Sequence, residues 1–174
     1  IKKDQSDIYL LQELKTIEEG FPKEIIKNAG YHSYVNGQKA WNGVAILSKE
    51  KLKITNTSIP KYDDPNARFI ETEIQLKKIK KYIKLINIYL PNGNPIETEK
   101  FDYKIEWMKK LNRYIKDLKK NNTPIIISGD FNVIPTDDDV YSPENFKNDA
   151  CAHPLTREQY RILINLGFTD LVKH

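Results

Sequence analysis

Apolar and polar residues alternate in several short runs of the chain, a pattern typical of β-strands with one buried face. Between residues 69 and 76, apolar and threonine side chains occupy alternate positions, with Glu71, Glu73 and Gln75 between them. A second apolar run follows and ends at Tyr89, so the two are expected to pair as an antiparallel hairpin. The pattern predicts strands at residues 8–12, 31–35, 43–48, 52–58, 69–76, 83–89 and 124–128.

Apolar residues at helical spacing are clearest between residues 98 and 120, which predicts a long helix. Shorter helices are predicted at residues 22–28, closed by Gly30, and at residues 156–166, closed by Gly167. Many strands with few helices favour two sheets packed on each other, with the helices outside. The predicted fold class is therefore α/β, or α+β in some schemes, with two packed mixed β-sheets flanked by helices in a four-layer sandwich.

The composition is that of an ordinary globular protein, with 39% hydrophobic and 30% charged residues among 174. This length suits one domain, and no apolar run reaches the roughly 20 residues that a membrane span needs. The single cysteine, Cys151, excludes a disulfide framework and favours a cytoplasmic location; it is expected to be buried or half-buried. The net charge of +4 permits nucleic acid as a partner without requiring it. The lysine-rich segment 77–81 is either a solvated hairpin turn or a contact to a DNA backbone.

Three of the predicted strands deliver polar residues at their C-terminal ends. The first leads to Glu13, the second to Tyr89 and the third to Asp130, with Asn132 two residues beyond. If the three strands are neighbours, these side chains converge at one rim of a sheet, where α/β proteins commonly place their sites. An extended chain from Asp130 to Asn132 would also point both side chains the same way.

These residue types suit phosphodiester hydrolysis. Glu13 offers a hard oxygen ligand to Mg²⁺, and Asp130 can hold or deprotonate an attacking water. Asn132 and Tyr89 can donate hydrogen bonds to water or phosphate. Taken singly, Glu13 and the Gly-Asp-Phe-Asn segment are equally typical of turns, and Tyr89 is typical of a packed rim aromatic. Their joint occurrence at the ends of apolar strands indicates a metal-dependent hydrolase.

Three motifs resemble the signature of the endonuclease/exonuclease/phosphatase superfamily: Leu-Gln-Glu-Leu-Lys at 11–15, Tyr-Leu-Pro-Asn-Gly at 89–93 and Gly-Asp-Phe-Asn at 129–132. Four further stretches are similar to the exonuclease III branch of abasic-site endonucleases, at residues 37–47, 68–74, 132–137 and 156–170. The resemblance implies Mg²⁺-dependent cleavage on the 5′ side of abasic sites in double-stranded DNA. It also implies 3′→5′ exodeoxyribonuclease activity on DNA with 3′ ends.

The resemblance assigns a role to each matching residue. Glu13 would be the magnesium ligand, with Mn²⁺ as a substitute metal, and Lys15 would support the carboxylate cluster. Asp130 would activate the nucleophilic water. Asn132 would support water and phosphate, and Tyr89 would touch the scissile phosphate.

Three further residues are implied to contact DNA. Asn92 would contact a phosphate, and Trp41 and Arg68 would lie on the DNA-facing surface. Trp41 is alternatively a packed aromatic. Arg68 is alternatively an ion-pair partner of Asp63, Asp64 or a neighbour.

The family also uses an asparagine on an earlier strand and acidic and Asp-His positions that would follow residue 174. His32, His153 and His174 do not lie in such a setting and are expected to be loop or surface residues. Residues 1–174 are therefore expected to form a single catalytic domain that lacks its first strand and its C-terminal strands, inactive by itself and monomeric, with no membrane contact. Two alternatives stay open: a phosphatase or phospholipase of the same superfamily, or a catalytically inactive DNA-binding fragment. The number of metal ions, one or two, also stays open.

Overall fold

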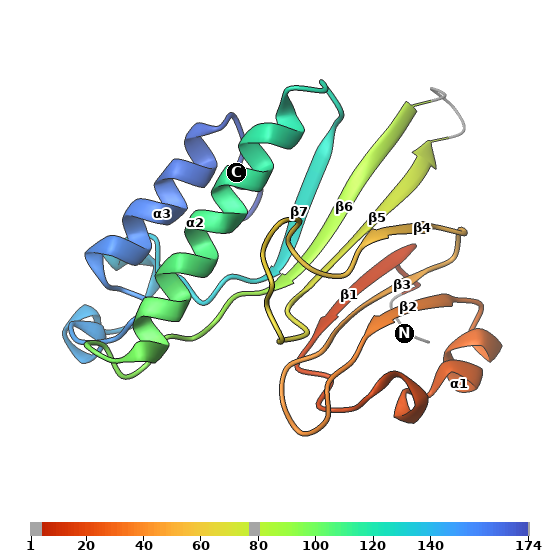
Figure 1. Ribbon diagram of the computed structural model, residues 1–174, viewed down its shortest axis with the longest axis horizontal. Helices are drawn as coiled ribbons and strands as arrows, with labels where there is room; N and C mark the ends of the chain where they lie inside the picture. The colour runs from red at the N-terminus through yellow and green to blue at the C-terminus, as the bar shows by residue number, and fades with distance from the viewer. Residues whose placement is uncertain (1–4, 77–80, 174) are drawn as a thin grey trace. The chain divides into compact units, whose positions relative to one another are not determined.

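The computed structural model describes residues 5–76 and 81–173, and the chain divides into two compact units (Figure 1). The sheet unit comprises Ile1–Tyr89 and Asn121–Asp130, and the helical unit comprises Leu90–Lys120 and Phe131–His174. The chain therefore passes between the units three times, and one of these passages directly follows Asp130.

The described strands all belong to the sheet unit and form two sheets (Figure 1). The first is antiparallel, in the order β1-β3-β2; the second, in the order β4-β5-β6-β7, is mixed, because β6 pairs antiparallel with β5 and parallel with β7. The elements are β1 Ile8–Gln12, η1 Glu18–Gly20, α1 Lys23–Asn28, β2 His32–Asn36, β3 Val44–Ser48, β4 Lys53–Asn56, β5 Phe69–Leu76, β6 Lys81–Tyr89, α2 Glu99–Lys119, β7 Ile125–Asp130, η2 Asp137–Asp139, η3 Pro143–Phe146 and α3 Pro154–Asn165.

Strand β3 is buried on both faces, and its alternating side chains contribute to two different cores. Val44 and Ile46 pack with apolar side chains of β5 and β6 in the second sheet. Ala45 and Leu47 point the other way and pack with Ile26 of α1. The first sheet is therefore covered by α1 on one face and by the second sheet on the other.

A buried amide ties the two sheets together. Asn87 of β6 is fully buried, and its Nδ2 donates to the backbone oxygens of Leu11 and Ala45 at 2.9 Å each. Its Oδ1 accepts a hydrogen bond from Gln12 Nε2 at 2.7 Å. A buried amide is stable only when it is hydrogen-bonded, so these three bonds fix one register between β6 and the pair β1–β3. The predicted packing of two sheets is confirmed.

The helical unit is built around α2 and α3. Asn112 Nδ2 on α2 donates to the backbone oxygen of Gln159 at 3.0 Å and to its Oε1 at 3.1 Å. Near the start of α2, Phe101 and Ile105 form a small core with Ala150. Of the helices within residues 5–76 and 81–173, none combines the length and the apolar character that crossing a membrane requires.

The predicted hairpin is confirmed, since β5 occupies residues 69–76 and pairs with β6 in antiparallel register. Of its lysine-rich turn, residues 77–80 lie outside the described residues. Strand β4 is shorter than the predicted 52–58, and its pairing with β5 is irregular between Ile54 and Asn56.

The predicted start of the last helix at Thr156 is wrong. Helix α3 begins at Pro154, with His153 as its N-cap, and the His153 ring nitrogen accepts a hydrogen bond from Leu155 N at 3.2 Å. Proline is favoured at the first helical position because its missing N–H has no partner to lose there.

Candidate active site

Glu13 directly follows β1 and adopts a left-handed backbone conformation, with φ of 53°. Two backbone hydrogen bonds hold this turn, from Leu14 N to Gly43 O at 3.3 Å and from Lys15 N to Asn42 O at 3.0 Å. A non-glycine residue with positive φ is strained and persists only where its surroundings fix it. The turn after β1 therefore presents the Glu13 carboxylate in one fixed place.

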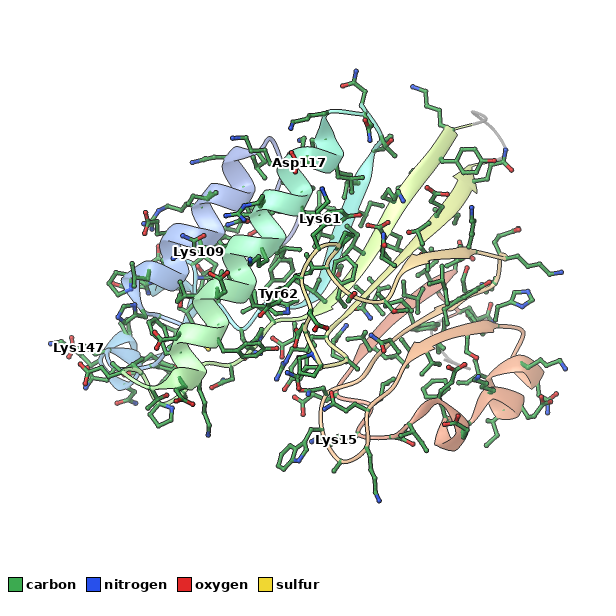
Figure 2. All side chains as sticks on the ribbon, viewed as in Figure 1. Lys15, Lys61, Tyr62, Lys109, Asp117 and Lys147 are labelled. Atoms are coloured by element: carbon green, nitrogen blue, oxygen red, sulfur yellow. The ribbon has the colours of Figure 1, made fainter. Side chains whose placement is uncertain are left out.

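The Glu13 carboxylate is half-exposed and paired with a lysine. Lys15 Nζ lies 3.0 Å from Glu13 Oε2, and 45% of the Glu13 side chain is exposed (Lys15 is labelled in Figure 2). The hydrogen bond from Lys15 is the main cause that lowers the pKa of Glu13 below its ordinary value, with a smaller contribution from a hydrogen bond donated by the Tyr89 hydroxyl. Glu13 is therefore ionised at neutral pH, as a metal-binding carboxylate must be.

We expect Lys15→Met to raise the pKa of Glu13 back towards its ordinary value, as measured by NMR titration of the glutamate carboxyl carbons. Because the folded pKa is lowered, the pair contributes stability above the unfolded pKa and loses it as pH falls through the folded value. Lys23→Met, which removes the partner of Glu18 instead, is the matched control and should leave Glu13 unchanged. An unchanged Glu13 titration in Lys15→Met would show that the pairing has no effect.

Tyr89, the last residue of β6, interacts with both Glu13 and Arg68. Burial, followed by the charge of Glu13, raises the pKa of the Tyr89 hydroxyl above its ordinary value, so the phenol stays protonated at neutral pH. Arg68 stacks over the Tyr89 ring at 4.8 Å and donates from Nη1 to the Tyr89 carbonyl at 3.1 Å. Tyr89 is therefore a hydrogen-bond donor rather than a nucleophile, and Arg68 is held on its ring.

Asp130, the last residue of β7, is half-buried and pairs in register with Tyr89. Its negative charge is one of the causes that raise the pKa of Tyr89. The sheet unit thus brings together three of the four side chains that were expected to converge, Glu13, Tyr89 and Asp130, whereas Asn132 belongs to the helical unit. The expected reason was wrong, because β1 is not a neighbour of β6 and β7 in one sheet but belongs to the sheet packed on them. The bridge through Asn87 supplies the alignment that a shared sheet would have given.

Trp41 lies in the loop before β3 and is 71% exposed, so its alternative interpretation as a packed aromatic is wrong. The loop itself is held from beneath by Asn42, which is buried. Its Nδ2 donates to Gln38 Oε1 at 2.9 Å and to Asn66 Oδ1 at 3.2 Å. A large exposed aromatic side chain on a fixed loop is available for contact with a partner.

Asn92 and Asn132 come together in the helical unit. Asn92 Nδ2 lies 3.4 Å from Asn132 Oδ1, and Asn132 Nδ2 donates to the backbone oxygen of Leu90 at 2.8 Å. Asn132 has φ of 45°, so the expected extended chain from Asp130 to Asn132 is wrong. The two asparagines form one amide pair at the ends of two loops.

One residue beside this pair, Lys104 of α2, was not predicted from the sequence. Its Nζ donates to the backbone oxygens of Asn92 at 2.9 Å and Asn132 at 2.6 Å. The signal in the sequence was a lysine three residues after Phe101 and four before Met108, within the apolar face of the long helix.

The remaining candidates behave as ordinary residues. His32 is exposed on β2, His153 caps α3, and His174 lies outside the described residues. Cys151 is half-buried, as predicted.

The donor set suits a metal that needs few protein ligands. Within the described part of the chain, no three histidine, cysteine, aspartate or glutamate side chains cluster as a metal site. Mg²⁺ is commonly held by one or two carboxylates, with water and substrate phosphate completing its shell. The half-exposed, ionised Glu13 fits that requirement as a single ligand.

A model of the endonuclease/exonuclease/phosphatase family matches residues 1–170, which confirms the resemblance inferred from the motifs. Exodeoxyribonuclease III of Haemophilus influenzae is 35% identical over 182 residues, which cover 98% of this chain and 66% of that relative.

Solved structures share the fold. An AP endonuclease from Archaeoglobus fulgidus superimposes with a TM-score of 0.90 and 32% identity, covering 99% of this chain and 65% of that chain. A 3′ phosphatase from Neisseria bound to a product DNA hairpin gives a TM-score of 0.87 and 32% identity, covering 97% of this chain and 63% of that chain. These neighbours confirm the predicted α/β class, and the chain spans slightly less than two thirds of each of these proteins.

Proposed function

Because the chain belongs to the endonuclease/exonuclease/phosphatase family, we propose that the full-length protein is a metal-dependent phosphodiesterase of DNA repair. It cleaves duplex DNA on the 5′ side of abasic sites and removes nucleotides from 3′ ends. The observation that carries the proposal is the grouping of Glu13, Tyr89 and Asp130 in the sheet unit, with the charge of each carboxylate acting on Tyr89. The names of the similar exodeoxyribonuclease and AP endonuclease support the choice of substrate.

Each residue has a distinct part in this proposal. Asp130 orients or deprotonates the attacking water, and the protonated Tyr89 hydroxyl donates to an oxygen of the scissile phosphate. Asn92 and Asn132 present side-chain amides to phosphate oxygens and water. These contacts stabilise the charge that develops on phosphate in the transition state.

Glu13 would hold the metal ion, and Mg²⁺ is the metal that its chemistry favours, with Mn²⁺ as a substitute. When bound, the metal polarises the phosphoryl oxygen and offsets developing negative charge. Lys15 lowers the pKa of Glu13 further below its ordinary value, and the carboxylate is ionised at neutral pH.

Double-stranded DNA is the proposed partner, with Trp41 and Arg68 on the surface that faces it. The exposed Trp41 offers a stacking surface, and Arg68 brings a positive charge to the ring of Tyr89. Contacts to phosphates would position the protein, and an abasic nucleotide has no base to unstack before it enters a pocket. We propose a cytoplasmic location, in keeping with the single cysteine, and a monomeric state.

The proposal is tested by titrating Mg²⁺ into full-length protein and Glu13→Gln, with abasic and intact duplexes as substrates. Wild-type protein should nick only the abasic duplex and should stop when the metal is chelated. Glu13→Gln should need at least about 10-fold more Mg²⁺ for half-maximal nicking, because a disturbed metal site commonly loses that much affinity.

Nicking without divalent metal would contradict the proposal. Turnover of inositol phosphate or sphingomyelin in place of DNA would instead favour the phosphatase or phospholipase alternative.

A further inference from the structure

Lys104 has an unusual environment for a lysine. It lies on α2 and is fully buried, although lysine is seldom fully buried unless it is paired. Its helical neighbours on the same face, Phe101 and Ile105, belong to the small apolar core around Ala150. A buried ammonium in such surroundings is costly unless it is fully hydrogen-bonded, so its partners must be well placed.

Two of those partners are main-chain oxygens of loops that are far apart in sequence, and a longer contact reaches Cys151 Sγ at 3.9 Å. Lys104 Nζ donates to Asn92 O at 2.9 Å and to Asn132 O at 2.6 Å. The side chains of the same two asparagines meet at 3.4 Å. The ammonium therefore links the backbones of the two loops at Asn92 and Asn132. These are the same residues whose side-chain amides contact each other.

The backbone at Gly93 packs closely against the aliphatic part of the Lys104 side chain. Gly93 has φ of +86°, and a Cβ added there would lie 2.5 Å from Lys104 Cδ and 3.2 Å from Ala150 Cβ. The loop after Asn92 thus passes directly over the lysine side chain, which leaves no room for any residue larger than glycine.

A third loop supplies a negative charge to this arrangement. Burial alone would raise the pKa of Asp149, but hydrogen bonds from Cys151 and Asn94, together with the charge of Lys104, lower it below its ordinary value. Asp149 accepts from Cys151 N at 2.7 Å and from Asn94 Nδ2 at 2.8 Å. Asn94 Oδ1 in turn accepts from Ala150 N at 2.9 Å, so the Asp149 loop is bound to the Asn92 loop.

We propose that Lys104 is a positioning residue for phosphodiester hydrolysis. Its ammonium fixes the carbonyl groups of Asn92 and Asn132, and so sets the place from which both side-chain amides reach the phosphate. The inference rests on the proposed function, because it concerns the phosphate-directed roles of these two asparagines. Displacing a catalytic group by about 1 Å can lower the rate about 100-fold. The gain in rate from correct positioning can therefore offset the cost of burying the Lys104 ammonium.

The test is a double-mutant cycle in the full-length protein, with Lys104→Met and Asn132→Ala made singly and together. Lys104→Met keeps the aliphatic stem and removes the ammonium. It should lower kcat for nicking abasic duplex by about 30- to 100-fold and change KM by less than about threefold. On the Asn132→Ala background the same substitution should lower kcat by a smaller factor than in the wild-type protein, because the part of its effect that acts through Asn132 is already lost and only the part through Asn92 remains.

Lys84→Met is the matched control, since Lys84 is a largely buried lysine that pairs with Glu71 at 2.8 Å and Glu73 at 2.9 Å. It should lower the melting temperature and leave kcat unchanged. Lys104→Arg, which keeps the charge, should recover part of the lost kcat. Should Lys104→Met not fold, Lys104→Gln takes its place, because its amide keeps a donor.

The outcomes separate the inference from the function on which it rests. If wild-type protein nicks abasic duplex and Lys104→Met has the same kcat, or if its effect is undiminished by Asn132→Ala, Lys104 is only structural and the inference is wrong. If wild-type protein does not nick DNA at all, the proposed function fails first.

Discussion

Replacing Asp130 by asparagine in the full-length protein should lower kcat for nicking abasic duplex by about 1,000-fold, within the range that a general base contributes. Asparagine has the same shape and can still accept a hydrogen bond, but it lacks the charge and the basicity that an attacking water needs. Asp130 ends β7 beside Tyr89, so the substitution should also lower the pKa of the Tyr89 hydroxyl, because one negative charge that raises it is gone. Single-turnover nicking measures the first effect, and NMR titration of the tyrosine Cζ carbons, with the Tyr89 signal identified by its loss in Tyr89→Phe, measures the second.

Asp138→Asn is the matched control for this substitution, because Asp138 is exposed in η2 and lies outside the candidate site. It should leave both measurements unchanged. The Mg²⁺ requirement provides a second comparison, since it should rise much more in Glu13→Gln than in Asp130→Asn. Equal nicking by Asp130→Asn and wild-type protein would remove Asp130 from the reaction.

Gly129→Ala should destabilise the protein by about 4 kcal/mol or more, the range reserved for steric conflicts that the backbone cannot relieve. Gly129 has φ of +137°, and an added Cβ would lie 2.0 Å from the backbone oxygen of Ile88 on the paired strand. Ile88 and Gly129 are paired residues of the β6–β7 ladder, so the clash can be relieved only by a backbone shift that disturbs this pairing. Because that pairing also sets Tyr89 beside Asp130, activity should fall with stability.

Gly30→Ala distinguishes steric conflict from backbone strain. Gly30 also has positive φ, at +89°, but an added Cβ there would meet nothing within 4 Å. Its cost should be limited to the strain of a left-handed residue, about 1 kcal/mol. Urea unfolding of the two variants measures the difference, and equal midpoints would show that the close approach at Gly129 is relieved by a shift of the strands.

The alternating pattern was enough to predict the strands, because a half-buried strand must repeat every two residues. It could not predict which sheet each strand joins. β1 has the same apolar character whether it pairs with β6 or packs on it, so the meeting of Glu13 and Tyr89 was expected for the wrong reason. The deciding contact, Asn87 bonded to Leu11 and Ala45, joins residues far apart in sequence and has no local signal.

The hydrophobic pattern also did not predict the conformation of Asn132 or the role of Lys104. Asn132 was predicted on an extended chain. It instead has a left-handed backbone conformation, which asparagine tolerates, and the extended chain does not continue through it. Lys104 was overlooked because an amphipathic helix is recognised by its apolar residues. A charged residue on the apolar face is informative for that reason, since only fixed partners make its burial tolerable.

Because Trp41 is exposed, its intrinsic fluorescence can report on contacts at the loop before β3. The chain has two tryptophans, and the other, Trp107, is 1% exposed. Iodide in solution should therefore quench the emission of Trp41 and leave that of Trp107 almost untouched. Any ligand that covers the loop before β3 should protect the quenchable fraction, so occupancy of this surface can be followed without an attached dye.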